Sequence, residues 1–224
     1  MSLTPFYYTW DKLPNTIQQN LCILDKDSPY HHYKTPKGKT YPSITTILSK
    51  LKDKSGLESW RNTVGEQVAE HIMQQALHYG RITHNIIEQY LQNDKVSEQS
   101  LIPEGHLRHL TPLLHKINHI QGIEVPLYSD ELKVAGTADC IARYDDVLSI
   151  IDFKTSRKQK QQDWIIDYFL QATAYSVMYE ELTRIQIPQI VILLSAEDGA
   201  TQEFVKNPKF YKPLLYHKLE EYYS

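Results

Sequence analysis

The spacing of apolar residues along the chain changes near Gly122. Before this residue, apolar side chains recur every three or four positions, a period that predicts helices. We expect Ser43 to cap the first helix, Tyr79-Gly80 to break or bend the second stretch, and Pro112 to kink or split the last. The predicted helical stretches begin at 43 and cover 57–77, 81–91 and about 103–120.

After Gly122 the pattern is that of strands. Apolar and polar residues alternate at period two, or apolar residues form short continuous runs, as in sheets with one or both faces covered. One long helical stretch lies between these strands, at 161–182, and a final helix is expected over 208–223. The predicted strands are 123–128, 132–144, 147–153, 189–195 and 201–206, of which the first three form a meander.

Residues 5–42 are rich in proline, tyrosine and turn-forming side chains. Tyr30-His31-His32-Tyr33 and Lys39-Thr40-Tyr41 flank Pro36-Lys37-Gly38, which predicts an N-terminal β-hairpin. The whole order of elements predicts an α/β (α+β) fold with a mixed central β-sheet flanked by helices. We expect a single domain over 1–224, in which the hairpin and helical region, about 1–120, packs on a core of about 121–224.

The composition is that of an ordinary globular chain. Its 224 residues are 41% hydrophobic and 23% charged, and the formal net charge is −3, so a nucleic-acid contact would need a local patch. The two cysteines, Cys22 and Cys140, are far apart, which argues against a disulfide scaffold and fits a reducing compartment. The sequence has no signal-peptide pattern and no run of about 20 apolar residues. We therefore expect a soluble cytoplasmic protein without a membrane partner.

Charged side chains gather at the end of the third predicted strand. Asp152 and Lys154 are two positions apart and point to one face, while Phe153 points to the other. A turn at 144–146 could place Asp139, on the preceding strand, beside them. Two carboxylates and a lysine at a strand end suit phosphodiester hydrolysis assisted by Mg²⁺ or Mn²⁺. The alternative interpretation is that both aspartates are strand-end turn residues.

Two helical pairs have the same spacing. His84 and Glu88 are four positions apart and share one predicted helix face. Gln171 and Tyr175 repeat this spacing on the helix that follows the Asp152 strand. Taken alone, the first pair is better explained as an ordinary surface pair, and Gln171 and Tyr175 as packing residues; the central motif favours a functional role for His84 and Glu88.

A cationic run, 157–160, follows the same strand. Its Arg157 and Lys158 could bind the phosphates that flank a scissile bond, although a solvated loop explains the run almost as well. Trp60 and Trp164 are most simply core or partly buried residues. A base-stacking role for them is left open by the sequence.

The candidate residues fall in four motifs: Gly80-x3-His84-x3-Glu88, Gly136-Thr-Ala-Asp139, Ile151-Asp152-Phe-Lys154-Thr-Ser156 and Gln171-x3-Tyr175. Their order and spacing resemble the RecB-like branch of the PD-(D/E)XK nuclease superfamily. The stretch 41–48, with Trp60 after it, is similar to the mitochondrial genome maintenance exonucleases and to related phage exonucleases. The resemblance covers about 41–175. It departs from the superfamily pattern at Ala138, where the name implies a proline.

The resemblance implies a role for each candidate. The metal would be held by Asp139 and Asp152, with Lys154 as the catalytic lysine. It also implies that His84 and the carbonyl oxygen of Phe153 bind the metal. Glu88 would be a ligand or supporting group. The pair Gln171 and Tyr175 would contact the nucleic acid and steady the site, and Ser43 would lie near the bound strand. Glu124 stands at an often acidic position before the central hairpin.

The function expected from these residues is a Mg²⁺- or Mn²⁺-dependent DNA exonuclease that acts on single strands or free DNA ends. Two alternatives stay open: a structure-specific endonuclease of the same fold, and a nucleic-acid-binding module whose site no longer cleaves. A mitochondrial member would need an import signal, and none is found in the sequence. The expected location is therefore the cytoplasm of a bacterium or of a phage-infected cell.

Overall fold

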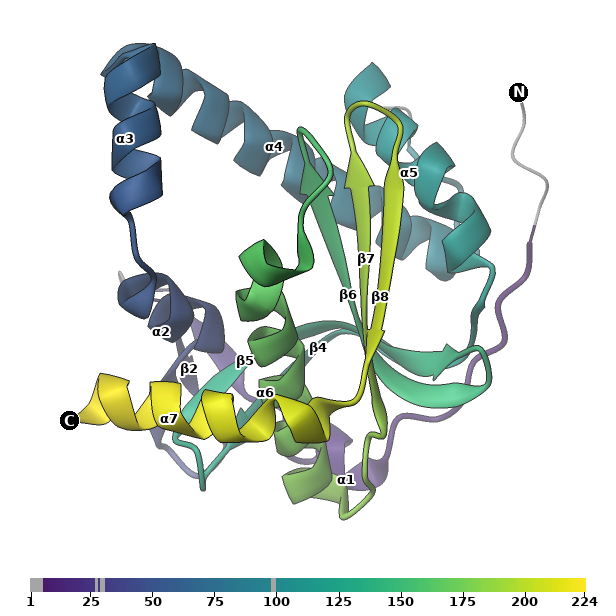
Figure 1. The fold of residues 1–224 in the computed structure, drawn as a ribbon. Helices are drawn as coiled ribbons and strands as arrows, with labels where there is room; N and C mark the ends of the chain where they lie inside the picture. The colour runs from purple at the N-terminus through teal and green to yellow at the C-terminus, as the bar shows by residue number, and fades with distance from the viewer. Residues whose placement is uncertain (1–5, 27, 29–30, 98–99) are drawn as a thin grey trace.

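A five-stranded mixed sheet forms the centre of the chain. In the computed structural model, which describes residues 6–26, 28, 31–97 and 100–224, the strand order is β4-β5-β6-β7-β8 (Figure 1). Neighbouring strands are antiparallel except β6 and β7, which are parallel and joined by a helical crossover. The predicted fold class is thus confirmed. The strands are β4 (Ile117–Ser129), β5 (Val134–Tyr144), β6 (Val147–Ser156), β7 (Gln189–Ala196) and β8 (Thr201–Lys206).

Helices cover both faces of this sheet. On β6, Ile150 joins the apolar cluster under α6 (Ile166–Thr183), while Ile151 joins the cluster under α4 (Glu66–Leu91) and α5 (Leu101–Leu114). This alternation follows from the period of two along a strand. Burial on both faces explains why β6 and β7 read as nearly continuous apolar runs.

The N-terminal region forms a small three-stranded antiparallel sheet of β1 (Ile23–Asp25), β2 (His32–Lys34) and β3 (Thr40–Pro42). Strands β2 and β3 form the predicted hairpin, whose first residue, Tyr30, lies outside the described residues. Strand β1 and the short helix α1 (Asn15–Gln18) were not predicted. The Oγ of Ser43 accepts a bond from Thr46 N at 3.1 Å and caps α2 (Ile44–Leu51), as expected.

The predicted break at Tyr79-Gly80 is wrong. Helix α4 runs through Gly80 without interruption, and the preceding helix, α3 (Ser55–Val64), ends instead at Gly65. Gly65 has φ +88°, a conformation that L side chains rarely adopt, so it ends the helix. Figure 1 shows the pair formed by α3 and the first half of α4 reaching away from the sheet.

Three other boundaries differ from the prediction. Helix α5 ends at Leu114 and stays a single helix through Pro112, and β4 then begins at Ile117 because it pairs with the end of β5. The stretch at 161–182 divides into a 3₁₀ turn, η1 (Gln162–Ile165), and α6. The chain ends with a 3₁₀ turn, η2 (Pro208–Phe210), and α7 (Lys212–Tyr223).

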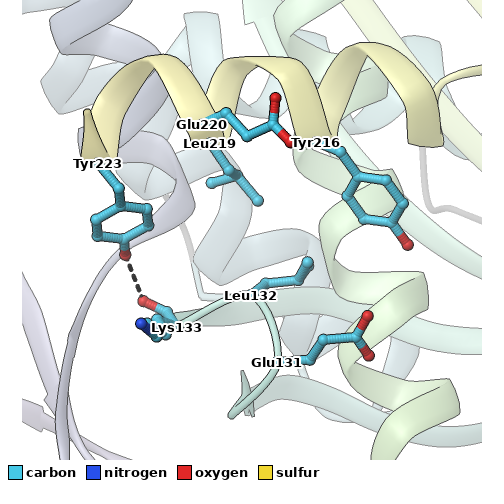
Figure 2. A pocket seen from close by; sticks show the side chains of 7 residues that line it. All are labelled: Glu131, Leu132, Lys133, Tyr216, Leu219, Glu220 and Tyr223. Atoms are coloured by element: carbon cyan, nitrogen blue, oxygen red, sulfur yellow. Dashed lines mark hydrogen bonds between the residues drawn. The ribbon is translucent and has the colours of Figure 1, made fainter.

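A cavity of about 370 Å³ lies between α7 and the β4–β5 turn (Figure 2). The hydroxyl of Tyr223 donates to the carbonyl oxygen of Lys133 at 2.6 Å, and Leu132 and Leu219 form part of its wall. None of the candidate site residues lines this cavity, so we assign it no role in the chemistry. Within the described ranges, no helix is long and apolar enough to cross a membrane.

Candidate active site

Strands β5 and β6 separate at the two aspartates. Their pairing runs from Tyr144–Val147 to Cys140–Ile151, so Asp139 and Asp152 are the next residues in register and face one another beyond the last pair. Past this point β5 stays paired with β4, whereas β6 stays paired with β7. The divergence opens the sheet beside two buried aspartates: as whole residues, Asp139 is 9% exposed and Asp152 is 0% exposed.

Glu124 is brought to the same place from β4. Pairing of Ile123 with Cys140 and of Val125 with Ala138 sets Glu124 opposite Asp139. Glu124 has φ +50°, which is uncommon for a side chain of this size and marks local backbone strain. The β4–β5 register also shifts just before it, between Asn118 and Gly122.

Helix α4 supplies the third member of the group. Nδ1 of His84 lies 3.5 Å from Oδ2 of Asp139, and that same oxygen accepts a bond from Phe153 N at 2.9 Å. One ligand atom from each of His84, Glu124 and Asp139 lies within 4.8 Å of the others. Three side chains from three separate elements therefore converge on one small volume.

This donor set fits a divalent metal ion. Ligand bonds of about 2.0–2.4 Å separate donors on opposite sides of an ion by about 4–4.8 Å, the span of the group. Burial of its carboxylate and the negative charge of Asp139 raise the pKa of Glu124 to about 7, even though the residue as a whole is exposed. A bound cation would offset the repulsion between the carboxylates of Glu124 and Asp139. Carboxylates held this close together are typical of a metal site.

Asp152 is paired with Lys154 rather than with this group. The lysine Nζ lies 2.9 Å from Oδ1 and 2.7 Å from Oδ2 of Asp152, whose side chain is 1% exposed. Burial raises the pKa of Asp152, an effect that the charge of Lys154 opposes. Burial also disfavours the charged form of Lys154, but the two aspartates outweigh it and raise the pKa of its ammonium group. The lysine therefore stays charged.

Helix α6 covers the pair from the other side. Lys154 Nζ donates to Oε1 of Gln171 at 3.3 Å, and Nε2 of Gln171 donates to the hydroxyl of Tyr175 at 3.3 Å. The ring of Tyr168 lies 5.1 Å from the same Nζ. Gln171 and Tyr175 are both buried, and their bonds run from Lys154 into the core. These bonds suit the predicted role of steadying the site, and the contact to nucleic acid stays a prediction.

Other predicted residues lie around this centre. Glu88 is one helical turn from His84, adds to the negative potential at Glu124, and accepts a bond from Gln92 at 3.1 Å. It is not part of the converging group. Ser43 is buried as the cap of α2 and forms an isolated bridge with Ala135, next to Gly136. The Phe153 carbonyl keeps its implied metal role as a prediction.

The cationic residues Arg157 and Lys158 lie apart from the carboxylates. They line a cavity of about 870 Å³ together with Trp60 and Trp164. Trp164 is 62% exposed, so its interpretation as a core or partly buried residue is wrong. Ile165, the next residue of η1, is buried in its place, and Trp60 is half-buried as expected.

Carboxylates, an imidazole and a charged lysine in one sheet opening can bind a phosphodiester and a metal together. A family model described as the PD-(D/E)XK nuclease superfamily matches residues 52–218. The chain belongs to this superfamily, as predicted. Membership and the names of its relatives support the predicted class of enzyme, a deoxyribonuclease.

The relatives are mitochondrial genome maintenance exonuclease 1 from three vertebrates. The Xenopus tropicalis protein is 29% identical over 179 residues, which are 72% of this chain and 50% of the relative. The human protein is 24% identical over 172 residues (71% and 50%), and the mouse protein 27% over 177 residues (71% and 51%). The chain thus spans about half the length of these relatives.

These relatives correct one expectation. The sequence predicted the cytoplasm of a bacterium or of a phage-infected cell, and the named relatives are eukaryotic mitochondrial proteins. The prediction rested on the absence of an import signal, which is a weak criterion because leader composition varies and lies outside the fold. We therefore withdraw that location.

Proposed function

We propose that the chain is a divalent-metal-dependent exonuclease that hydrolyses phosphodiester bonds in single-stranded DNA or at free DNA ends. The observation that carries the proposal is the convergence of His84, Glu124 and Asp139 beside the Asp152–Lys154 pair. The exonuclease names of the relatives support the preference for ends. We further propose that the chain forms a single nuclease domain, with its N-terminal and helical region packed on the catalytic core.

The proposed roles follow from charge and position. His84, Glu124 and Asp139 would hold Mg²⁺ or Mn²⁺, with Asp152 and the Phe153 carbonyl available on the next strand. When bound, the ion would lower the pKa of water and neutralise charge on the phosphate. Between these two metals, the imidazole favours Mn²⁺, since Mg²⁺ prefers oxygen donors alone.

Lys154 would act on the reacting phosphate itself. Its ammonium group is charged, fixed by Asp152 and Gln171, and 18% exposed as a side chain, so it can reach a ligand without being free to move. A preorganised cation of this kind stabilises the negative charge that develops in the transition state. Glu88 would support the metal group from one turn away on α4.

The test compares four substrates. End-labelled linear and circular DNA, each single-stranded and duplex, are incubated with the chain and Mn²⁺ or Mg²⁺. We expect cleavage of linear single strands from an end, and no cleavage of circular single strands. Lys154→Ala and Asp139→Asn should each lower the rate by at least about 100-fold.

Two results would overturn the proposal. Cleavage of circular single strands would indicate an endonuclease. Binding of DNA without cleavage under any divalent metal would indicate a non-catalytic binding module. Circular dichroism of each variant shows whether the fold is retained, so that a loss of activity is not a loss of structure.

A further inference from the structure

The cavity of about 870 Å³ beyond the catalytic strand has a composition of its own. It is lined by two tryptophans from distant segments, Trp60 on α3 and Trp164 on η1, and by three glutamines. Its charged residues are Arg157, Lys158 and Lys160 against a single acid, Glu197. The volume lies within the range of ligand-binding pockets. The excess of positive charge favours an anionic ligand.

The cationic segment is held in a defined shape. Gln202 on β8 accepts a bond from Lys160 N at 2.7 Å and donates to the carbonyl oxygen of Lys160 at 2.9 Å. The backbone N–H of Glu197 donates to the carbonyl oxygen of Ser156 at 3.0 Å, and the Ser156 hydroxyl donates to that of Lys158. Bonds at both ends make this segment a fixed wall, which argues against the solvated-loop interpretation.

The charges on this wall are available to a ligand. Among residues 6–26, 28, 31–97 and 100–224, no carboxylate forms a salt bridge with Arg157, Lys158 or Lys160. Lys116, by contrast, is paired with Glu203 at 2.9 Å. Three unpaired cations on a fixed segment resemble a phosphate-binding surface more than a random exposed loop.

Both tryptophans keep part of their surface accessible at this cavity. Trp164 is 62% exposed, and Trp60 is half-buried on α3, a helix that contributes no residue to the buried core. An indole beside a cluster of cations offers a flat apolar face on which a nucleobase can stack. Arg157 directly follows β6, the strand that carries Lys154, and Tyr168, one helical turn after Trp164, lies over Lys154 Nζ at 5.1 Å. The two ends of the cavity's cationic and aromatic wall therefore lead back to the candidate active site.

We propose that this cavity binds two or three nucleotides of single-stranded DNA next to the scissile bond, with bases stacked on Trp164 and Trp60 and phosphates bound by Arg157, Lys158 and Lys160. The inference rests on the proposed nuclease function and adds the subsite that selects single strands. Stacking on an indole needs an unpaired base, because bases inside a duplex already stack on their neighbours. Recognition of this kind is independent of sequence.

The test measures binding alone. Fluorescence anisotropy with a labelled oligothymidine, in the presence of a chelator, compares the wild-type chain with Trp164→Ala and Trp164→Phe. Loss of one stacked base should weaken binding by about 5- to 140-fold, and phenylalanine should restore most of it. Trp10→Ala is the matched control, since Trp10 is 43% exposed but lies beside Ile120, outside the cavity.

A second oligonucleotide separates stacking from a structural role. If Trp164 stacks on bases, an abasic oligonucleotide of the same length should bind the wild-type chain and Trp164→Ala equally. If Trp164→Ala weakens the binding of both oligonucleotides by the same factor, the residue only shapes the cavity and the inference is wrong. The same conclusion holds if Trp10→Ala has the larger effect.

The cations give an independent measure. Each phosphate contact to a single strand contributes about 0.7 to the slope of log affinity against log salt concentration. Substituting Arg157, Lys158 and Lys160 by glutamine should therefore lower the slope by about 2, and an unchanged slope would contradict the phosphate contacts. Because no metal is present, these measurements are independent of cleavage. If the chain shows the predicted tryptophan and salt effects on binding but cleaves no DNA, the subsite is supported and only the nuclease proposal is wrong.

Discussion

Gly136 on β5 packs directly against the ring of Tyr175 on α6. A β-carbon built at position 136 would lie 2.7 Å from Cε1 and 3.0 Å from the hydroxyl of Tyr175. Real β-carbons do not approach other atoms this closely, so any side chain at 136 must displace the ring. Tyr175 in turn bonds Gln171, which bonds Lys154. Gly136, three residues before Asp139, thus sets the position of Tyr175, and Tyr175 supports Lys154 through Gln171.

The first prediction concerns this contact. Gly136→Ala should shift Tyr175, weaken the hold of Gln171 on Lys154, and lower the cleavage rate. It should also lower the free energy of unfolding by about 1–3 kcal/mol, the usual cost of overpacking a core.

The control is Gly105→Ala on α5, where a β-carbon meets nothing within 4 Å and helix propensity should make the change neutral or stabilising. Urea denaturation and the cleavage assay measure both effects. Unchanged stability in Gly136→Ala would show that the ring moves freely.

A second prediction separates the structural and chemical roles of the buried ion pair. Lys154→Met leaves the Asp152 carboxylate, 1% exposed, without its cation. We expect a loss of about 3 kcal/mol in the free energy of unfolding, limited because Asp152 can take up a proton instead. The double variant Asp152→Asn with Lys154→Met removes both charges and should recover most of this stability while remaining inactive. Urea denaturation compares the three proteins. A double variant as unstable as Lys154→Met would contradict the pairing.

A third prediction uses a histidine outside the site. His106 on α5 is 3% exposed, and its Nδ1 lies 2.9 Å from the hydroxyl of Ser195 on β7. Burial, and then the nearby His109, lower the pKa of His106 below its ordinary value of 6.5. Below pH 6.5 the His106 side chain therefore takes up a proton more readily in the unfolded chain than in the folded one. The contribution of His106 to the free energy of unfolding is complete above pH 6.5 and declines as the pH falls below it.

His106→Asn retains a polar atom near Ser195 but does not titrate. We expect its urea midpoint to fall less between pH 8 and pH 5.5 than that of the wild-type chain. At each pH the measured quantity is the urea midpoint of His106→Asn divided by that of the wild-type chain. The other groups titrate equally in both proteins, so a change in this ratio reports on His106. Parallel midpoints over this range would mean that His106 is already accessible to protons in the folded state.

Patterns within a few neighbouring residues predict the centre of the site. They fail for residues whose position depends on segments far apart in the sequence. Asp139, Asp152 and Lys154 were found because one short turn and the period of two fix their relation within a few residues. Glu124 was recognised only as an often acidic position, because its place depends on a register shift and on a left-handed backbone conformation that no local pattern reports. Such strained residues are frequent at functional sites.

The helical region shows the same limit. Sequence alone does not tell which of two glycines ends a helix. Gly80 is the predicted break, but it lies inside α4. A β-carbon at position 80 would meet the Thr155 hydroxyl at 3.4 Å, an ordinary contact distance. Gly65 ends α3 because its backbone conformation excludes other residues. Trp164 is predicted to be a core or partly buried residue because tryptophan usually is. In the structure its neighbour Ile165 occupies the core instead, and Trp164 is 62% exposed.

The last prediction tests the metal group through stability rather than through activity. A ligand that binds only the folded state at 100 times its Kd adds about 2.7 kcal/mol to the free energy of unfolding, a shift of about 5–10 °C in Tm for a chain of this size. Mn²⁺ should produce such a shift, since it relieves the repulsion between Glu124 and Asp139. His84→Ala and Glu124→Gln should each remove most of the increment. His119→Ala should keep it, because His119 pairs with Asp11 at 3.2 Å outside the group. Equal shifts in His84→Ala and the wild-type chain would place the metal elsewhere.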